Sequence, residues 1–277
     1  MADPILSVRD LSKTYAQRAA FLAPKAEATR PALAAASFDL AEGEILGVVG
    51  ESGSGKTTLA RCIALLERPD TGQVLFRGQD LVELEGAALR RRRRAIQTVF
   101  QDPYASLNPR LKVGSALAEV MLVHKLAESS EVRERVIALL GQVGLPSSAA
   151  DAYPAAFSGG QRQRICIARA LAAQPDILVA DEPVSSLDVS VQAQIVNLLL
   201  DLRQRLGLSV IFIGHDLQLI DFLAPRVVVM LAGEIVETLQ ADRLATDAQH
   251  DYTRALMNAV PSLDKLSAHY TSRETTT

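Results

Sequence analysis

The sequence has few of the features that mark secreted or membrane-spanning proteins. Among 277 residues only two are cysteines, Cys62 and Cys166, and each lies in an apolar helical pattern without metal-ligand spacing. We therefore expect two small buried thiols in a reducing compartment rather than a disulfide or a metal site. The N-terminus has no basic region followed by an apolar run, which predicts no secretory signal. No segment approaches the roughly 18–20 apolar residues that a membrane helix needs.

Neither positive nor negative charge is in large excess. The chain has 29 Lys and Arg against 32 Asp and Glu, a net charge of −3, so no global field attracts nucleic acid. Five consecutive arginines at 90–94 are the local exception. They lack interleaved aromatic residues and belong to an acidic chain, so we interpret them as a solvated basic face before a strand. A composition of 48% hydrophobic and 22% charged residues is that of an ordinary globular protein.

The order of apolar patterns along the chain predicts an α/β protein with a largely parallel sheet. The expected strands are 5–11, 37–40, 45–49, 73–76, 96–100, 177–180, 210–213, 227–231 and a short hairpin strand at 234–237. Only helical periodicity, at 113–126 and 131–143, occupies the middle of the chain, which predicts an inserted helical subdomain with its own motion. The alanine-rich stretch 16–36 predicts a flexible insertion. A final helix is expected at 252–260, before a polar tail.

A complete phosphate-binding loop lies between an expected strand, 45–49, and a helical pattern, 57–66. Its residues are Gly50, Glu51, Ser52, Gly53, Ser54, Gly55, Lys56 and Thr57, and Thr58 follows. The glycines let successive backbone N–H groups point at phosphate oxygens, where the helix N-terminus also favours negative charge. Lys56 is placed to contact the β- and γ-phosphates, and the Thr57 hydroxyl to ligate Mg²⁺. The loop therefore predicts binding of a nucleoside triphosphate with Mg²⁺.

Polar side chains follow three further strands of the expected sheet. Asp181 and Glu182 follow 177–180, His215 follows the strand ending at 213, and Gln101 follows 96–100. Because the carboxyl ends of parallel strands open onto the crevice where α/β sheets bind ligands, we expect these side chains to face the nucleotide. Asp181 is suited to hold Mg²⁺ and Glu182 to act as general base toward water. His215 is expected to contact the γ-phosphate, and Gln101 to ligate Mg²⁺ or the attacking water.

The segment 157–164 narrows the class of protein. It contains the residues Ser158, Gly159, Gly160 and Gln161, which open a helical pattern at 161–171. These residues resemble the signature motif of the ATP-binding-cassette (ABC) family, and the resemblance covers nearly the whole chain. It implies that this helix N-terminus faces the γ-phosphate of ATP bound to a second ATPase subunit. The Ser158 hydroxyl, the two glycines and the dipole of the helix that follows all suit such a contact with phosphate.

The same resemblance implies a fold and further roles. The fold is a P-loop NTPase of the ABC type, with a mainly parallel core sheet, an N-terminal antiparallel β subdomain and a helical subdomain at about 102–173. The ATPase domain would span 1–260 and the tail 261–277. Tyr15 would stack on adenine, and Asp188 would lie in the loop that couples the two ATP sites. His215 would be the switch histidine, and with Lys56 and Glu182 it completes the expected catalytic set.

Two positions depart from the family pattern. Phe157 stands where leucine is commoner before the signature serine, and Gly214 stands where Ser, Thr or Ala is usual before the histidine. Neither change removes a reacting group, so ATP hydrolysis remains the expectation.

Three segments, 101–110, 181–190 and 250–256, resemble ATPase subunits of the peptide/nickel importer group, and 16–36 resembles the second (F-type) ATPase of such pairs. The resemblance implies a peripheral protein at the cytoplasmic face of the inner membrane. Its partners would be a second ATPase subunit, either related or identical, two membrane permeases and an extracytoplasmic solute-binding protein. Peptides are the expected cargo, with nickel, opine-like or oligosaccharide-like solutes and a soluble non-transport ABC ATPase as alternatives. No cysteine follows Cys166, which predicts no iron–sulfur cluster in the tail.

Overall fold

The computed structural model describes residues 3–15 and 31–259, and its centre is a mostly parallel sheet. In this part of the chain six strands pair in the order β10-β9-β3-β8-β7-β6. They are β3 (Ile45–Val49), β6 (Ile96–Val99), β7 (Ile177–Asp181), β8 (Ser209–Gly214), β9 (Arg226–Leu231) and β10 (Glu234–Gln240). All neighbours run parallel except β9 and β10, which form an antiparallel hairpin. Every residue of β3, β7 and β8 is buried, as expected of strands covered on both faces.

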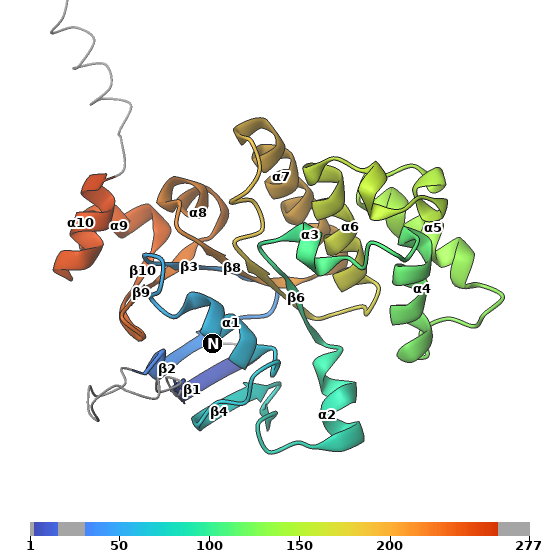
Figure 1. The fold of residues 1–277 in the computed structure, drawn as a ribbon. Coiled ribbons are helices and arrows are strands. Elements are labelled where there is room, and N and C mark those ends of the chain that lie inside the picture. Colours follow the sequence, from blue (N-terminus) through green and yellow to red (C-terminus); the bar gives the residue numbers. More distant parts are fainter. Residues whose placement is uncertain (1–2, 16–30, 260–277) are drawn as a thin grey trace, which may run out of the picture.

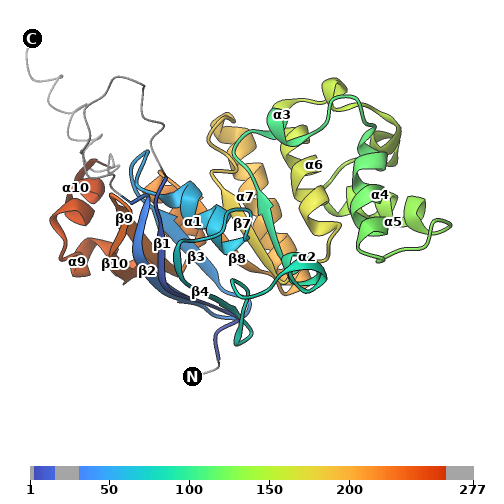
Figure 2. The same ribbon diagram turned by 60° about the horizontal axis from the view of Figure 1, so that its bottom comes forward.

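A second, antiparallel sheet covers one face of the first (Figures 1 and 2). Its order is β2-β1-β4-β5, with β1 (Leu6–Lys13), β2 (Leu33–Leu40), β4 (Thr71–Phe76) and β5 (Gln79–Asp80). Helix α1 (Lys56–Ile63) lies between the sheets, because its Leu59 and Ile63 share one apolar cluster with Leu6 of β1 and Val48 of β3. The phosphate loop is therefore held between two sheets. This arrangement confirms the expected N-terminal antiparallel subdomain.

The remaining helices are α2 (Gly86–Arg93), α3 (Pro103–Ser106), α4 (Val113–Val123), α5 (Val132–Gln142), α6 (Gly159–Leu171), α7 (Val189–Leu206), α8 (Leu217–Leu223), α9 (Leu244–Asp247) and α10 (Asp251–Ala259), with short 3₁₀ turns at Ser147–Asp151, Pro154–Ala156 and Ala241–Arg243. Most of them lie on the other face of the core sheet, whereas Leu89 of α2 packs against the apolar cluster between the two sheets. Helices α4, α5 and α6 gather at one end of the molecule (Figure 1). Leu117, Leu140 and Ile165 from these helices join a single apolar cluster with Leu178 and Phe212 of the sheet. The helical subdomain therefore packs directly on the core. No helix within 3–15 and 31–259 is long and apolar enough to cross a membrane.

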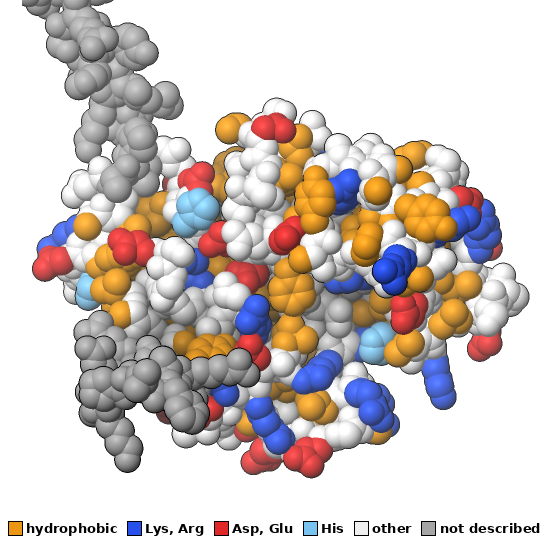
Figure 3. All heavy atoms as spheres, in the orientation of Figure 1, with side chains coloured by type: hydrophobic (Ala, Val, Ile, Leu, Met, Phe, Trp, Pro, Cys, Tyr) orange, Lys and Arg blue, Asp and Glu red, His pale blue; other side chains and the backbone are white. Residues whose placement is uncertain are grey.

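The structure corrects one sequence expectation and agrees with another. Strand β2 begins at Leu33, so the predicted insertion 16–36 extends too far. Alternation buries Ala36, Phe38 and Leu40, but Leu33 is buried out of phase with them, across an irregularity in the pairing with β1, so the start of the strand has no regular apolar pattern. The five arginines at 90–94 belong mainly to a helix, α2, which buries none of its residues. Lys and Arg side chains gather over α2 in Figure 3, in agreement with a solvated basic face. The predictions for 16–30 and for the tail 261–277 concern residues outside the described part of the chain.

Candidate nucleotide site

A cleft of about 650 Å³ opens at the carboxyl ends of β3, β7 and β8. It is lined by Ala32, Glu51, Ser52, Gly53, Gly55, Lys56, Thr57, Thr58, Gln101, Glu182 and His215. Nearly all of these residues were predicted to meet here, and the parallel register explains why. Val49 of β3 pairs with Gly214 of β8, and Asp181 of β7 pairs with Ile213, so the residues that follow these strands lie at the same edge.

Glycine is required at two positions of the phosphate loop. Gly50 and Gly55 have φ angles of 157° and 102°. A Cβ atom would lie 2.3 Å from the carbonyl oxygen of Met230 at the first position and 2.4 Å from that of Ala32 at the second. The loop is therefore packed against neighbouring backbone on its outer side.

Lys56 is fixed at the start of α1. Its Nζ donates hydrogen bonds to the carbonyl oxygens of Gly50 and Glu51, at 2.7 and 2.8 Å. Burial lowers the pKa of Lys56 below its ordinary value, and the nearby carboxylates of Glu182 and Asp181 oppose this shift. The ammonium group is thus held inside the loop, at the place where phosphate oxygens would be bound.

Thr57 and Asp181 form an oxygen pair that suits a hard cation. The Thr57 hydroxyl donates to Asp181 Oδ1 across 3.4 Å. Asp181 is 3% exposed, and burial raises the pKa of its carboxyl group. A buried carboxylate whose side-chain partner is one long hydroxyl contact has spare acceptor capacity, and Mg²⁺ prefers such oxygen ligands. The donor set therefore fits a Mg²⁺ ion that also contacts a nucleotide.

Glu182 lies close to two other polar side chains of the cleft, those of Gln101 and His215. Gln101 Nε2 donates to Glu182 Oε2 at 3.1 Å, and His215 Nδ1 is 3.6 Å from the same oxygen. The backbone of Glu182 is left-handed, with φ 47°, while its N–H donates to the carbonyl oxygen of Ile213. A non-glycine residue in this conformation costs roughly 1–2 kcal/mol, a strain often found at functional sites. The strand end holds Glu182 in this shape beside Gln101 and His215.

Tyr15 lies at the rim of the cleft. Its hydroxyl donates to a carboxylate oxygen of Glu67 and contacts Thr58 Oγ1 at 3.4 Å. Burial raises the pKa of Tyr15, although 43% of the residue remains exposed. The ring therefore lies beside Thr58, the residue that follows the phosphate loop, with part of its surface free. Its predicted contact with adenine stays a prediction.

The signature residues form a helix cap away from this cleft. Ser158 N–H donates to Gln161 Oε1 at 3.0 Å, and Gln161 N–H donates to Ser158 Oγ at 3.4 Å, a reciprocal capping box at the start of α6. Asp188 caps α7 in a similar way, accepting from Val191 N–H and the Ser190 hydroxyl. None of these residues is among the described residues that line the cleft.

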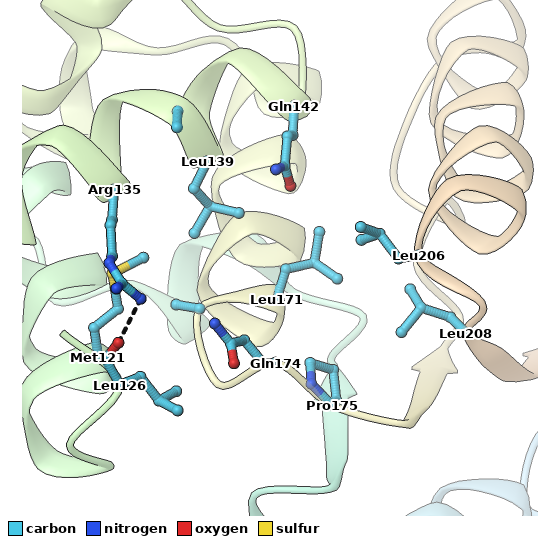
Figure 4. A pocket seen from close by; sticks show the side chains of 12 residues that line it. Met121, Leu126, Arg135, Leu139, Gln142, Leu171, Gln174, Pro175, Leu206 and Leu208 are labelled. Carbon is cyan, nitrogen blue, oxygen red and sulfur yellow. Dashed lines mark hydrogen bonds between the residues drawn. The ribbon is translucent and has the colours of Figure 1, made fainter.

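A second cavity, of about 450 Å³, has a different character (Figure 4). It lies between the helical subdomain and the amino ends of β7 and β8, at the opposite edge of the sheet from the loop. Leucines and Met121 make up half of its lining residues, and Arg135 is turned back onto the carbonyl oxygen of Leu126. Its apolar lining does not suit phosphate. The cleft at the loop is therefore the better candidate for a nucleotide site.

Two residues at the loop were not predicted. Ala32 lines the cleft, and the hydroxyl of Tyr252 accepts a hydrogen bond from the N–H of Glu51 at 2.8 Å. The sequence signals for Tyr252 are its place in the 250–256 segment and at the start of the expected helix 252–260. No spacing in the sequence connects that segment with the phosphate loop.

A sheet of this topology with a phosphate loop, a buried aspartate and a following glutamate defines a P-loop ATPase. The family model of the ABC transporter matches residues 33–185, and the chain belongs to this family. As a member it binds and hydrolyses ATP.

Known relatives agree with this assignment. The chain is 49% identical over 261 residues to a putative peptide import ATP-binding protein of Brucella ovis, covering 94% of this chain and 80% of that one. It is 46% identical over 264 residues to the dipeptide transport ATP-binding protein of Escherichia coli, covering 95% and 78%. A dimeric ATP-binding cassette solved in a post-hydrolysis state with ADP and phosphate is 29% identical, with a TM-score of 0.74 over 85% of this chain and 98% of that one.

Proposed function

We propose that this protein is the ATP-hydrolysing subunit of a peptide importer. It would act at the cytoplasmic face of the membrane with a second ATPase subunit, two permeases and an extracytoplasmic solute-binding protein. The names of its relatives in Brucella ovis and Escherichia coli support peptides as cargo. The observation that carries the proposal is the separation of two half-sites. The groups for ATP chemistry share one cleft, whereas the cap Ser158–Gln161 lies outside it.

Within one chain, the cleft supplies binding and water activation. Lys56 and the loop amides would hold the β- and γ-phosphates, and Thr57, Asp181 and Gln101 would hold Mg²⁺. The ion would neutralise the charge that develops on the transferred phosphate. Glu182 would accept a proton from the attacking water. Gln101 donates to Oε2 of Glu182, which leaves Oε1 to accept from water, and His215 would contact the γ-phosphate.

The second half-site would come from the partner subunit. Ser158 and the first backbone amides of α6 form a helix N-terminus, which favours a phosphate group. Gly159, Gly160 and Gln161 would let this backbone approach the partner's ATP, and Asp188 would lie at the same interface. Two ATP molecules would thus be enclosed by two cassettes. Preference of ATP for the closed dimer would supply the work of transport.

The test is Glu182→Gln in the complex reconstituted with its permeases, second ATPase and binding protein. The variant should bind ATP normally, lose ATPase activity by about 10²- to 10⁴-fold and stop importing labelled di- and tripeptides. Glu83→Gln, at an exposed carboxylate, is the matched control and should transport normally. Full ATPase activity in the Glu182→Gln complex would refute the catalytic assignment. Uptake of Ni²⁺ or an opine in place of peptides would refute the proposal that peptides are the cargo.

A further inference from the structure

The segment 250–256 takes no part in the chemistry described above, yet it reaches the phosphate loop. It begins helix α10, and Tyr252 lies in the first turn of this helix. The N–H of Glu51 donates to the Tyr252 hydroxyl at 2.8 Å, a contact between residues 201 positions apart. Glu51 is the second residue of the loop, so the C-terminal helix is tied to the start of the ATP site.

Both polar groups of the Glu51 backbone are engaged. Its carbonyl oxygen accepts from Lys56 Nζ at 2.8 Å, while its N–H is used by Tyr252. The amide is therefore directed away from the place where phosphate would be bound. Any influence of Tyr252 on the nucleotide must pass through the shape of the loop and the position of Lys56.

The Tyr252 side chain is itself held in place. Glu237 of β10 accepts hydrogen bonds from the backbone N–H groups of Gln249 and His250, at 2.7 and 3.4 Å. The N–H of Tyr252 donates to Nδ1 of His250 at 3.1 Å. The ring is partly buried against the main apolar cluster. The hydroxyl is thus presented to the loop from a fixed support.

A second contact from the same part of the chain acts on the same loop. The N–H of Gly233, in the turn between β9 and β10, donates to the carbonyl oxygen of Ser54 at 3.0 Å. The hairpin thus fixes the middle of the loop, and Tyr252 fixes its beginning. A loop held from outside at two points loses less conformational freedom when it binds a ligand.

We propose that Tyr252 is a positioning residue for nucleotide binding, whose hydroxyl holds the phosphate loop in its binding conformation through the Glu51 amide. The residue contacts neither the nucleotide nor the water. Its loss should therefore weaken ADP and ATP equally and leave the rate of the chemical step unchanged.

The variant Tyr252→Phe removes the hydroxyl and keeps the ring. For the purified full chain, titration calorimetry with ADP should show a Kd raised by about 2- to 10-fold, the range for one hydrogen bond. In the reconstituted complex, KM for ATP should rise by a similar factor at unchanged kcat. Tyr153→Phe is the matched control. Its residue is 48% exposed, and its hydroxyl has no hydrogen-bond partner among the described residues. Both its Kd and its KM should equal those of the wild type.

Three results would overturn the proposal. A lower Tm with an unchanged ADP Kd would mean that the hydroxyl only stabilises α10. A lower kcat at constant KM would place Tyr252 in the chemical step. Tyr252→Leu, which removes the ring as well, should weaken ADP at least as much as Tyr252→Phe, and a smaller effect would also contradict the proposal. ADP titration needs neither permease nor peptide, so this test stands whether or not the protein imports peptides.

Discussion

Gly160 is expected to be sensitive to substitution for a reason that lies inside the chain. It is the second residue of α6, and a Cβ built on it would be 2.4 Å from Cγ1 of Val191 in the first turn of α7. Valine is stiff at χ1 in a helix, so Val191 cannot turn aside freely. The adjacent Gly159 provides the comparison, because its Cβ would meet Leu187 Cδ2 at 3.4 Å, an ordinary contact.

The magnitude follows from two opposing effects. Overpacking of this kind costs typically about 1–3 kcal/mol, and replacing glycine by alanine returns about 0.4–1 kcal/mol through the unfolded chain. A net destabilisation of about 0–2.6 kcal/mol remains for Gly160→Ala, which should lower Tm by up to about 10 °C in a chain of this size. For Gly159→Ala only the favourable effect applies, so Tm should be unchanged or slightly raised.

Thermal melts of the nucleotide-free chain measure this difference, and a Val191→Ala background separates two roles of Gly160. The double variant Gly160→Ala/Val191→Ala should recover the Tm of Val191→Ala alone, because the clash is gone. If the glycine also meets the partner's ATP, the double variant should still lack ATPase activity in the complex. Equal Tm values for Gly159→Ala and Gly160→Ala would refute the steric reasoning.

Three further predictions concern stability. Burial raises the pKa of Asp181 above 3.8, so wild-type stability falls as pH rises from 3.8 to the folded pKa. Asp181→Asn should therefore melt higher than wild type without nucleotide at pH 7, and the gap should close as the pH falls through that window. Gly47→Ala, whose Cβ would lie 2.3 Å from Ile220 Cγ2, should lose about 1–3 kcal/mol in urea unfolding, less in an Ile220→Ala background. Arg226→Met breaks two hydrogen bonds to Glu44, at 2.9 and 3.0 Å, and should cost about 3 kcal/mol, part of which adding Glu44→Gln restores.

The parts of the fold that could be predicted are those where one physical signal is decisive. Strands β3, β7 and β8 are buried throughout and read as unbroken apolar runs. Helix α2 buries no residue, so it has no apolar periodicity and was not found. Helix α7 was also not assigned, although Asp188 and Gly207 mark its ends, the latter with φ 66°. Its buried residues Ile195, Leu198, Leu199 and Leu202 also recur at helical spacing, so the sequence contained the signal for this helix.

The site shows the same division. Gln101, Asp181, Glu182 and His215 could be predicted to converge because each follows a strand of one parallel sheet. The contact of Tyr252 with Glu51 depends on how α10 folds back over the hairpin. No local pattern encodes such a contact between distant elements. The left-handed backbone of Glu182 was equally hidden, since glutamate is not a residue that favours positive φ.

The signature segment at the start of α6 packs against the start of α7. Gly160 approaches Val191 and Gly159 approaches Leu187, so the start of α6 lies against the start of α7. Each start has its own side-chain cap, Ser158 for α6 and Asp188 for α7. Two capped helix N-termini packed together form one unit with partial positive charge, which suits a phosphate group better than a single flexible loop does. Because this unit lies outside the chain's own cleft, we propose that it completes an ATP site on another subunit. The glycines would then be constrained from both sides, by α7 within the chain and by the nucleotide across the interface.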